Sequence, residues 1–205
     1  MFELDHIAVA GETLEEAATR VEERLGVPLE TGGEHREMGT HNRLLSLGPG
    51  LYLEAIAINP AADAPDRPRW FDLDCFKGPA RLKNGIARTD DLTGALSCAP
   101  LGMGIPIDFQ RGQFRWAMAV PETGKLPYDN VVPALMRWDC AVHPSDALTD
   151  RNCRLRRLLI QHPQADELLD AFPALVALPL VEIEAFERPA LVAEIDTPHG
   201  LRFLD

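Results

Sequence analysis

Residues Phe2–Gly26, FELDHIAVAGETLEEAATRVEERLG, decide the first step of the fold. The opening nine residues are mostly apolar, and Gly11 follows them, a pattern typical of a short strand. The next stretch places apolar residues at helical spacing on one face: Leu14, Ala17, Ala18, Val21 and Leu25. Thr13 followed by Glu16 fits a helix capping box, and Gly26 is a typical helix end. The sequence therefore predicts a strand that leads directly into an amphipathic helix.

Two strand-like runs follow this unit, at 42–47 (NRLLSL) and 51–58 (LYLEAIAI), with the turn Gly48–Gly50 between them. Residues 61–79 are rich in Pro, Ala and Asp and indicate a connection. The pattern then restarts, because residues 80–96 align with residues 2–18 at a constant offset of 78. In this alignment Leu82 matches Leu4, and Asp91 takes the N-cap position of Thr13. We interpret the restart as an internal duplication.

The last third repeats the order strand, helix, strand, strand more loosely. We therefore predict an α+β protein with a first βαβββ module at 1–60, a connection at 61–79 and a second module-like unit at 80–145. A C-terminal βαβββ-like unit at 150–205 is expected to pack with both as one domain.

Composition excludes several classes of function. The chain has 205 residues and a formal net charge of −12, so a nucleic-acid partner is not expected, since such a surface repels phosphate backbones. The four cysteines show no C-x-x-C spacing, which argues against a thiolate zinc site and favours free thiols. The N-terminus lacks the pattern of a signal peptide, and long apolar runs are absent from the sequence. We expect a cytoplasmic protein with no membrane partner.

Three segments carry a resemblance to a known group: LDHIAVA (4–10), GTHNRLLSLGPGLYLEAIAINP (39–60) and RWDCAVHPS (137–145). In these segments the chain resembles glyoxalase-like domain proteins of the vicinal oxygen chelate superfamily, which includes glyoxalases, bleomycin resistance proteins and dioxygenases. The resemblance implies paired βαβββ modules that form a curved, partly open mixed β-barrel with helices outside. It also implies a divalent metal in the cupped face and a homodimer.

The same resemblance assigns metal ligands. His6 matches the ligand position on the first strand, and Glu54 matches the carboxylate on the last strand of the module. Alternate strand residues share a face, so Glu54 is expected to point the same way as Tyr52 and Ile56. A buried carboxylate is destabilising unless it is paired or binds a metal, whereas a carboxylate at a sheet edge can also serve to block aggregation. His6, taken alone, is more often a hydrogen-bonded strand histidine than a ligand.

The second module departs from the family pattern. Asn84 stands at the position that matches His6, and the only acid in the matching last strand is Asp139. When Pro60 is aligned with Pro144, Asp139 falls one residue out of register with Glu54, which would turn its side chain to the other face. The metal site is therefore either rebuilt from other residues (His41, His143 or Asp139) or lost.

Further candidate ligand-binding residues surround these positions. His41 and Asn42 lie in the polar run GTHN (39–42), whose side chains either reach a pocket or cap the neighbouring backbone. Arg115 and Trp138 are of types that grip planar or anionic groups, but they equally fit a surface arginine beside a core tryptophan. His143 is a further candidate. We expect His35, among Glu34, Arg36 and Glu37, to be solvated.

The function implied is that of a glyoxalase-like protein acting on a small oxygen-rich metabolite. If it is an enzyme, it is of the lyase, isomerase or dioxygenase type, with His6 and Glu54 holding a divalent ion (Zn, Ni, Fe, Mn or Mg) that polarises a carbonyl. Glu54 or Asp139 would move a proton as the catalytic carboxylate. The alternative is a metal-free small-molecule binding protein on the same fold.

Overall fold

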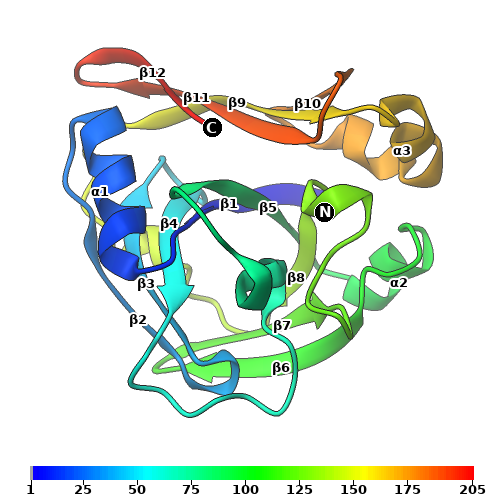
Figure 1. Cartoon of the computed structure of the whole chain (residues 1–205), viewed down its shortest axis with the longest axis horizontal. Coiled ribbons are helices and arrows are strands. Elements are labelled where there is room, and N and C mark those ends of the chain that lie inside the picture. Colours follow the sequence, from blue (N-terminus) through cyan, green and yellow to red (C-terminus); the bar gives the residue numbers. More distant parts are fainter. Residues whose placement is uncertain (1) are drawn as a thin grey trace.

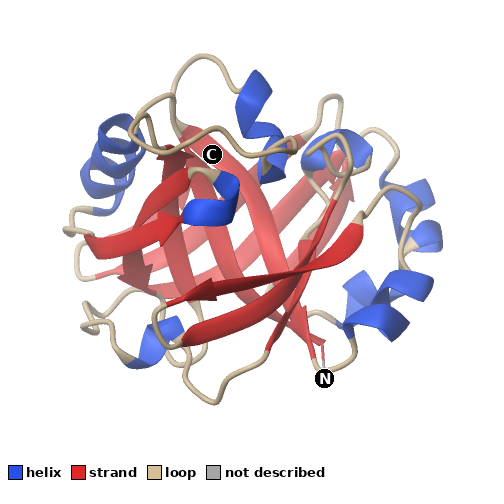
Figure 2. Ribbon diagram, turned by 90° about the horizontal axis from the view of Figure 1, so that it is seen from below, coloured by secondary structure: helices blue, strands red, loops and turns tan. Residues whose placement is uncertain are grey.

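The computed structural model describes residues 2–205 and contains two sheets with helices around their periphery (Figure 1, Figure 2). The first sheet has eight strands in the order β2-β3-β4-β1-β5-β8-β7-β6 and curls into a half-barrel. This confirms the predicted α+β fold with a curved, partly open barrel. Its strands are β1 (Phe2–Ala10), β2 (Glu30–His35), β3 (Thr40–Ser46), β4 (Tyr52–Ile58), β5 (Arg81–Thr89), β6 (Ile105–Arg111), β7 (Phe114–Val120) and β8 (Ala134–Trp138).

Each half of this sheet has the same connectivity. β1 pairs in parallel with β4, and β3 and β2 continue outward from it; β5 pairs in parallel with β8, followed by β7 and β6. Helix α1 (Leu14–Leu25) begins with the predicted capping box of Thr13 and Glu16 and ends at Gly26, and it buries its apolar face. Helix α2 (Leu92–Ser97) begins at Asp91, whose side chain accepts a hydrogen bond from the amide of Gly94.

The two halves meet along the antiparallel pair of β1 and β5. Ile7 lies opposite Gly85, and the flanking pairs are His6 with Ile86 and Ala8 with Asn84. Adding 78 to a residue number in β1 gives the equivalent residue in β5, so the pair of His6 with Ile86 is equivalent to the pair of Asn84 with Ala8. Ile7 and Gly85 are equivalent to each other. It follows that Asn84 occupies the position of His6 in the second half, as the sequence alignment predicted.

A β-bulge interrupts β1 at Asp5. Leu4 pairs with Ala87 and His6 pairs with Ile86, so Asp5 is the extra residue of the bulged strand. A bulge breaks the alternation of side chains. The side chain of Asp5 therefore reaches the ring of its neighbour His6, although adjacent residues of a regular strand point to opposite faces.

The register of β8 corrects the sequence alignment of the last strands. Ala8 pairs with Glu54, and Ile86, its counterpart, pairs with Ala134. Ala134 therefore takes the position of Glu54 in the second half, whereas Asp139 lies beyond the end of β8. The alignment of Pro60 with Pro144 was wrong because Pro144 lies further along the chain from Ala134 than Pro60 does from Glu54.

The C-terminal unit forms a second sheet, which lies outside β1 and β5 (Figure 1). It contains β9 (Arg154–His162), α3 (Ala165–Ala171), β10 (Val181–Ala185), β11 (Ala190–Thr197) and β12 (Gly200–Leu204). The element order is the expected βαβββ, but the strand order is β10-β9-β11-β12, with β9 parallel to β10. It therefore differs from the other two units, in which the first strand pairs in parallel with the last. A Cβ at Gly85 would lie 2.8 Å from Leu158, so glycine permits this close packing.

The connection between the halves covers the cupped face. It contains the 3-10 helix η2 (Trp70–Cys75), the short blue-green coil inside the ring of strands in Figure 1. Phe71 and Asp72 adopt left-handed backbone conformations, with φ of 59° and 57°. Such values are uncommon for a bulky residue and occur where the surrounding structure enforces them. η2 is thus held over the cup in a strained conformation.

Two further features bear on the predictions from composition. Cys75, Cys98, Cys140 and Cys153 are all free thiols in the described chain, as predicted. Over residues 2–205, every helix falls short of the length and apolar character that a membrane crossing requires.

Candidate functional site in the cupped face

The cupped face contains a cavity of about 30 Å³. Its polar lining comes mainly from the first half, and its apolar lining comes from η2 and the second half. A cavity of this size has room for one or two water molecules. The lining residues are His6, His35, Asn42, Tyr52, Glu54, Trp70, Phe71, Arg111, Trp116, Met118, Met136 and Trp138.

His6 and Glu54 face each other in this cavity. Nε2 of His6 lies 3.6 Å from Oε1 of Glu54, and the two residues are only 5% and 4% exposed. The other carboxylate oxygen of Glu54 accepts a hydrogen bond of 2.7 Å from Nδ2 of Asn42. The ring of His6 stacks on Tyr52, with ring centroids 4.4 Å apart. One nitrogen and one oxygen are thus held at fixed positions beside the cavity.

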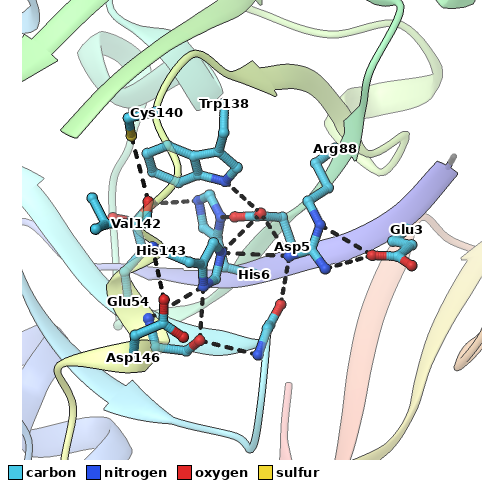
Figure 3. A network of polar contacts seen from close by, with 12 residues as sticks. Glu3, Asp5, His6, Glu54, Arg88, Trp138, Cys140, Val142, His143 and Asp146 are labelled. Atoms are coloured by element: carbon cyan, nitrogen blue, oxygen red, sulfur yellow. Dashed lines mark hydrogen bonds and ion pairs between the residues drawn. The ribbon is translucent and has the colours of Figure 1, made fainter.

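Asp5 holds the other side of the His6 ring (Figure 3). Its Oδ1 lies 2.7 Å from Nδ1 of His6, while Oδ2 accepts hydrogen bonds from Nε1 of Trp138 (2.8 Å), Nε2 of His143 (3.1 Å) and Nη1 of Arg88 (3.2 Å). Asp5 is fully buried. The carboxylate thus has four partners, one at Oδ1 and three at Oδ2. Asp5 therefore joins β1 to β5 and to the segment that follows β8.

These contacts set the charges of the site. Burial by itself lowers the pKa of His6, but hydrogen bonding to Asp5 and the charge of Glu54 outweigh burial and raise that pKa to about 9. Burial raises the pKa of Glu54, yet the adjacent His6 holds the pKa of this carboxyl below its usual value. The pKa of Asp5 is likewise lowered, because its partners overcome the effect of burial. At neutral pH the site holds an imidazolium between two carboxylates.

His35 is a buried part of the cavity wall and not the solvated residue that the sequence suggested. It ends β2, and its Nε2 accepts a hydrogen bond of 2.9 Å from Nη1 of Arg111, because an arginine can only donate. Nδ1 then carries the proton and donates to Oγ1 of Thr40, 3.0 Å away. Burial lowers the pKa of His35 to about 3, so this ring is neutral.

His41 lies on the opposite face of β3 from Asn42 and does not line the cavity. The expectation that His41 contacts a ligand while His35 does not is reversed by strand alternation: Asn42 points into the cup, so its neighbour points out. Arg115 and Asp139 also lie outside, where Asp139 pairs with Arg137 and its amide donates to the carbonyl of Arg115. Neither reaches the cavity. Trp138 lines it, whereas His143 lies behind the wall, where its ring contacts Tyr52 and Trp138.

The second half of the cup does not supply a matching pair of metal ligands. The side chain of Asn84 donates to the carbonyls of Asn130 and Val132 and accepts from the amide of Ala134. Ala134, at the position of Glu54, has no donor atom in its side chain. Within residues 2–205, no cluster of three or more His, Cys, Asp or Glu side chains is suited to a metal ion. Resident metal sites usually have at least three protein ligands, so this donor set fits only half of a chelate.

With this geometry in place, the family can be assigned. A family model described as a glyoxalase-like domain matches residues 4–176. The chain belongs to the glyoxalase-like domain family. This confirms the resemblance seen in its sequence to the vicinal oxygen chelate superfamily. No curated protein sequence matches the chain.

Solved structures similar to this glyoxalase-like protein have little sequence identity to it. A hypothetical protein from Staphylococcus aureus has a TM-score of 0.62 at 13% identity, over 92% of this chain and 88% of its own, and so shares the fold. Streptomyces coelicolor methylmalonyl-CoA epimerase has a TM-score of 0.41 at 14% identity, over 68% and 97%. Glyoxalase I from Zea mays has a TM-score of 0.26 at 12% identity, over 100% and 92%.

Proposed function

We propose that this protein is an enzyme that moves a proton next to a carbonyl group of a small oxygen-rich metabolite, without a resident metal. One observation supports the proposal most: a buried imidazolium, His6, and an ionised carboxylate, Glu54, both face the cavity only 3.6 Å apart. Nε2 of His6 and Oε1 of Glu54 form an ion pair of 3.6 Å, which is longer than a normal hydrogen bond, so Nε2 can also donate to a ligand in the cavity. An acid and a base are thus offered to one small molecule.

The reaction follows from these two groups. Glu54 takes a proton from the carbon beside the carbonyl; the electron pair of that C–H bond forms a carbon–carbon double bond, and the π pair of the carbonyl moves onto its oxygen. The Nε2–H group of His6 donates to this oxygen and stabilises its negative charge, as an oxyanion hole does. Return of a proton from solvent to the same carbon gives exchange. Where that carbon also carries a hydroxyl, the hydroxyl proton passes to the original carbonyl oxygen, and protonation of the original carbonyl carbon gives isomerisation. Asp5 keeps His6 oriented and protonated throughout.

Entry of such a ligand requires η2 to move. The cavity of about 30 Å³ accommodates water but no organic substrate, and Trp70 and Phe71 of η2 form part of its wall. Movement of a short covering segment is a common way to admit a substrate and then to exclude water. The strained backbone of Phe71 and Asp72 is consistent with a segment that has a second conformation.

A metal-dependent enzyme is the second candidate. It is favoured by the orientation of the two donor atoms, since Asp5 fixes the ring of His6 and Asn42 fixes Glu54, as outer partners of metal ligands do. His6 and Glu54 would then hold the ion, which would polarise a carbonyl as a Lewis acid. The rest of the cup opposes this reading because it offers Met118, Met136 and Trp138 in place of further ligands.

Removal of divalent metals separates the two candidates. We expect protein purified without a metal-affinity column to contain far less than one metal ion per chain. We also expect a chelator to leave both its unfolding temperature and proton exchange unchanged, because His6 already carries the positive charge. Added Zn²⁺, Ni²⁺, Mn²⁺ or Mg²⁺ should produce little stabilisation. A stoichiometric metal that is lost from His6→Ala and Glu54→Ala, or a metal-dependent rise in unfolding temperature that both variants lack, would establish the second candidate instead.

A further inference from the structure

Arg111 connects the two edges of the half-barrel beside the cavity. It is the last residue of β6, one edge of the sheet, and it reaches β2 and β3 at the other edge. Its Nη1 donates to Nε2 of His35 at 2.9 Å and to Oδ1 of Asn42 at 3.4 Å. Gly33 permits this approach, since a Cβ there would lie 2.8 Å from Cδ of Arg111. The guanidinium is thereby fixed at the cavity wall, and the side-chain amide of Asn42 lies between it and Glu54.

The charge of Arg111 has no counter-ion among the residues that the structure describes. Both of its acceptors are uncharged, because His35 is held in the neutral form and Asn42 is an amide. Among residues 2–205, no carboxylate lies within ion-pair distance of Arg111, although the chain carries a net charge of −12. The two carboxylates nearby are engaged elsewhere, Glu54 with His6 and Asp5 with His6 and Arg88.

One edge of the guanidinium is free. Nε and Nη2 of Arg111 have no acceptor within the described part of the chain, and neither is a fully buried atom. The Nε–Nη2 edge of an arginine matches the two oxygens of a carboxylate in a bidentate pair. An arginine that is fixed by neutral partners and keeps this edge open beside a cavity is arranged to bind an anion.

We infer that Arg111 binds the carboxylate of the ligand, and that the ligand is a small 2-oxo acid. The carboxylate would pair with the free edge of Arg111, and the adjacent carbonyl would face Nε2 of His6. The carbon that follows the carbonyl would then lie near Glu54. The carboxylate site stands on the contacts of Arg111, whereas the choice of a 2-oxo acid rests on the proposed function.

The test compares 2-oxobutanoate with butanone, which has the same carbonyl and no carboxylate. Calorimetry on the whole chain is expected to show saturable binding of 2-oxobutanoate and far weaker binding of butanone. Arg111→Gln should weaken binding of 2-oxobutanoate roughly 10- to 100-fold, and Arg111→Lys should recover part of it because the charge remains but the fork is lost. Arg115→Gln is the matched control, since Arg115 is an exposed arginine on the next strand outside the cup; its binding should equal that of the wild type.

Other results would overturn the inference. It fails if Arg111→Gln, shown to be folded by its unfolding transition, binds 2-oxobutanoate as tightly as the wild type does. It also fails if butanone binds equally well, or if the wild type binds neither compound. The proposed function fails separately: if the wild type binds 2-oxobutanoate through Arg111 but does not exchange its protons, the carboxylate site stands and the proton-transfer reaction does not.

Discussion

Asp5→Ala is expected to destabilise the protein by about 3–5 kcal/mol, the range typical of breaking a buried ion pair by removing one partner. The substitution leaves His6 without its main counter-ion. It also leaves Nε1 of Trp138 and Nε2 of His143 without their acceptor at a site where Asp5 is fully buried. Arg88 is affected less because it keeps its ion pair with Glu3. The measurement is the free energy of unfolding in urea.

Two further variants make this result interpretable. Asp5→Asn keeps the shape of the side chain and one acceptor, so its loss should be smaller than that of Asp5→Ala. Asp139→Asn removes an acid from an exposed ion pair with Arg137, and we expect a change within about 0.5 kcal/mol. If Asp5→Ala were no more destabilising than Asp139→Asn, Asp5 would not be the residue that holds the site together.

Glu54→Gln is expected to abolish proton exchange, with a fall in rate of about 100- to 10,000-fold. The amide keeps the size of the side chain and can still accept from Asn42, but it cannot take a proton from carbon. The assay follows the protons next to the carbonyl of 2-oxobutanoate by NMR in heavy water. Spontaneous exchange in the absence of protein sets the baseline.

This variant should keep ligand binding while it loses proton exchange. Glu54→Gln is expected to bind 2-oxobutanoate at least as well as the wild type, because it removes a negative charge close to the ligand carboxylate. Glu37→Gln, an exposed acid of the same half of the protein, is the control and should exchange at the wild-type rate. Equal exchange by Glu54→Gln and the wild type would show that Glu54 is not the base.

The fold could be predicted from the sequence because its signals are local or repeated. The capping box at Thr13, the helix end at Gly26 and the offset of 78 residues that places Asn84 at the position of His6 all appear in the structure. Such features depend on residues close together in the chain, or on the comparison of one half with the other.

The site could be predicted only in part. Glu54 and Asn42 lie in regular strands, whose alternation turns both side chains into the cup, and the same rule would have excluded His41 had the register of β3 been fixed. His6 was assigned from its match to the first strand of the family. Asp5 was missed because a bulge reverses its direction, and a bulge leaves no mark in a single sequence.

Residues that reach the site from distant segments were also missed. Arg111 reaches His35 only because the curled sheet brings its two edge strands together. Trp70 and Phe71 reach the cavity because the connection between the halves folds over the cup. Asp139 was misplaced because the last strands of the two halves align through their pairing with β1 and β5, and the prolines beyond them carry no information on that register.

In the metal-free protein His6 is an imidazolium held between Asp5 and Glu54, and its charge has a consequence for stability. Its folded pKa of about 9 lies above the ordinary value of 6.5. The resulting stabilisation, roughly 3 kcal/mol, is therefore fully present below pH 6.5 and is lost as the pH rises through about 9.

The most direct test is an NMR titration of the ring nitrogens of His6 in chelator-treated protein. Both nitrogens should be protonated through neutral pH, and one of them should lose its proton near pH 9. A His6 ring that is already neutral at about pH 7 would rule out the proposed reaction, because a neutral ring could not supply the charge that this reaction requires.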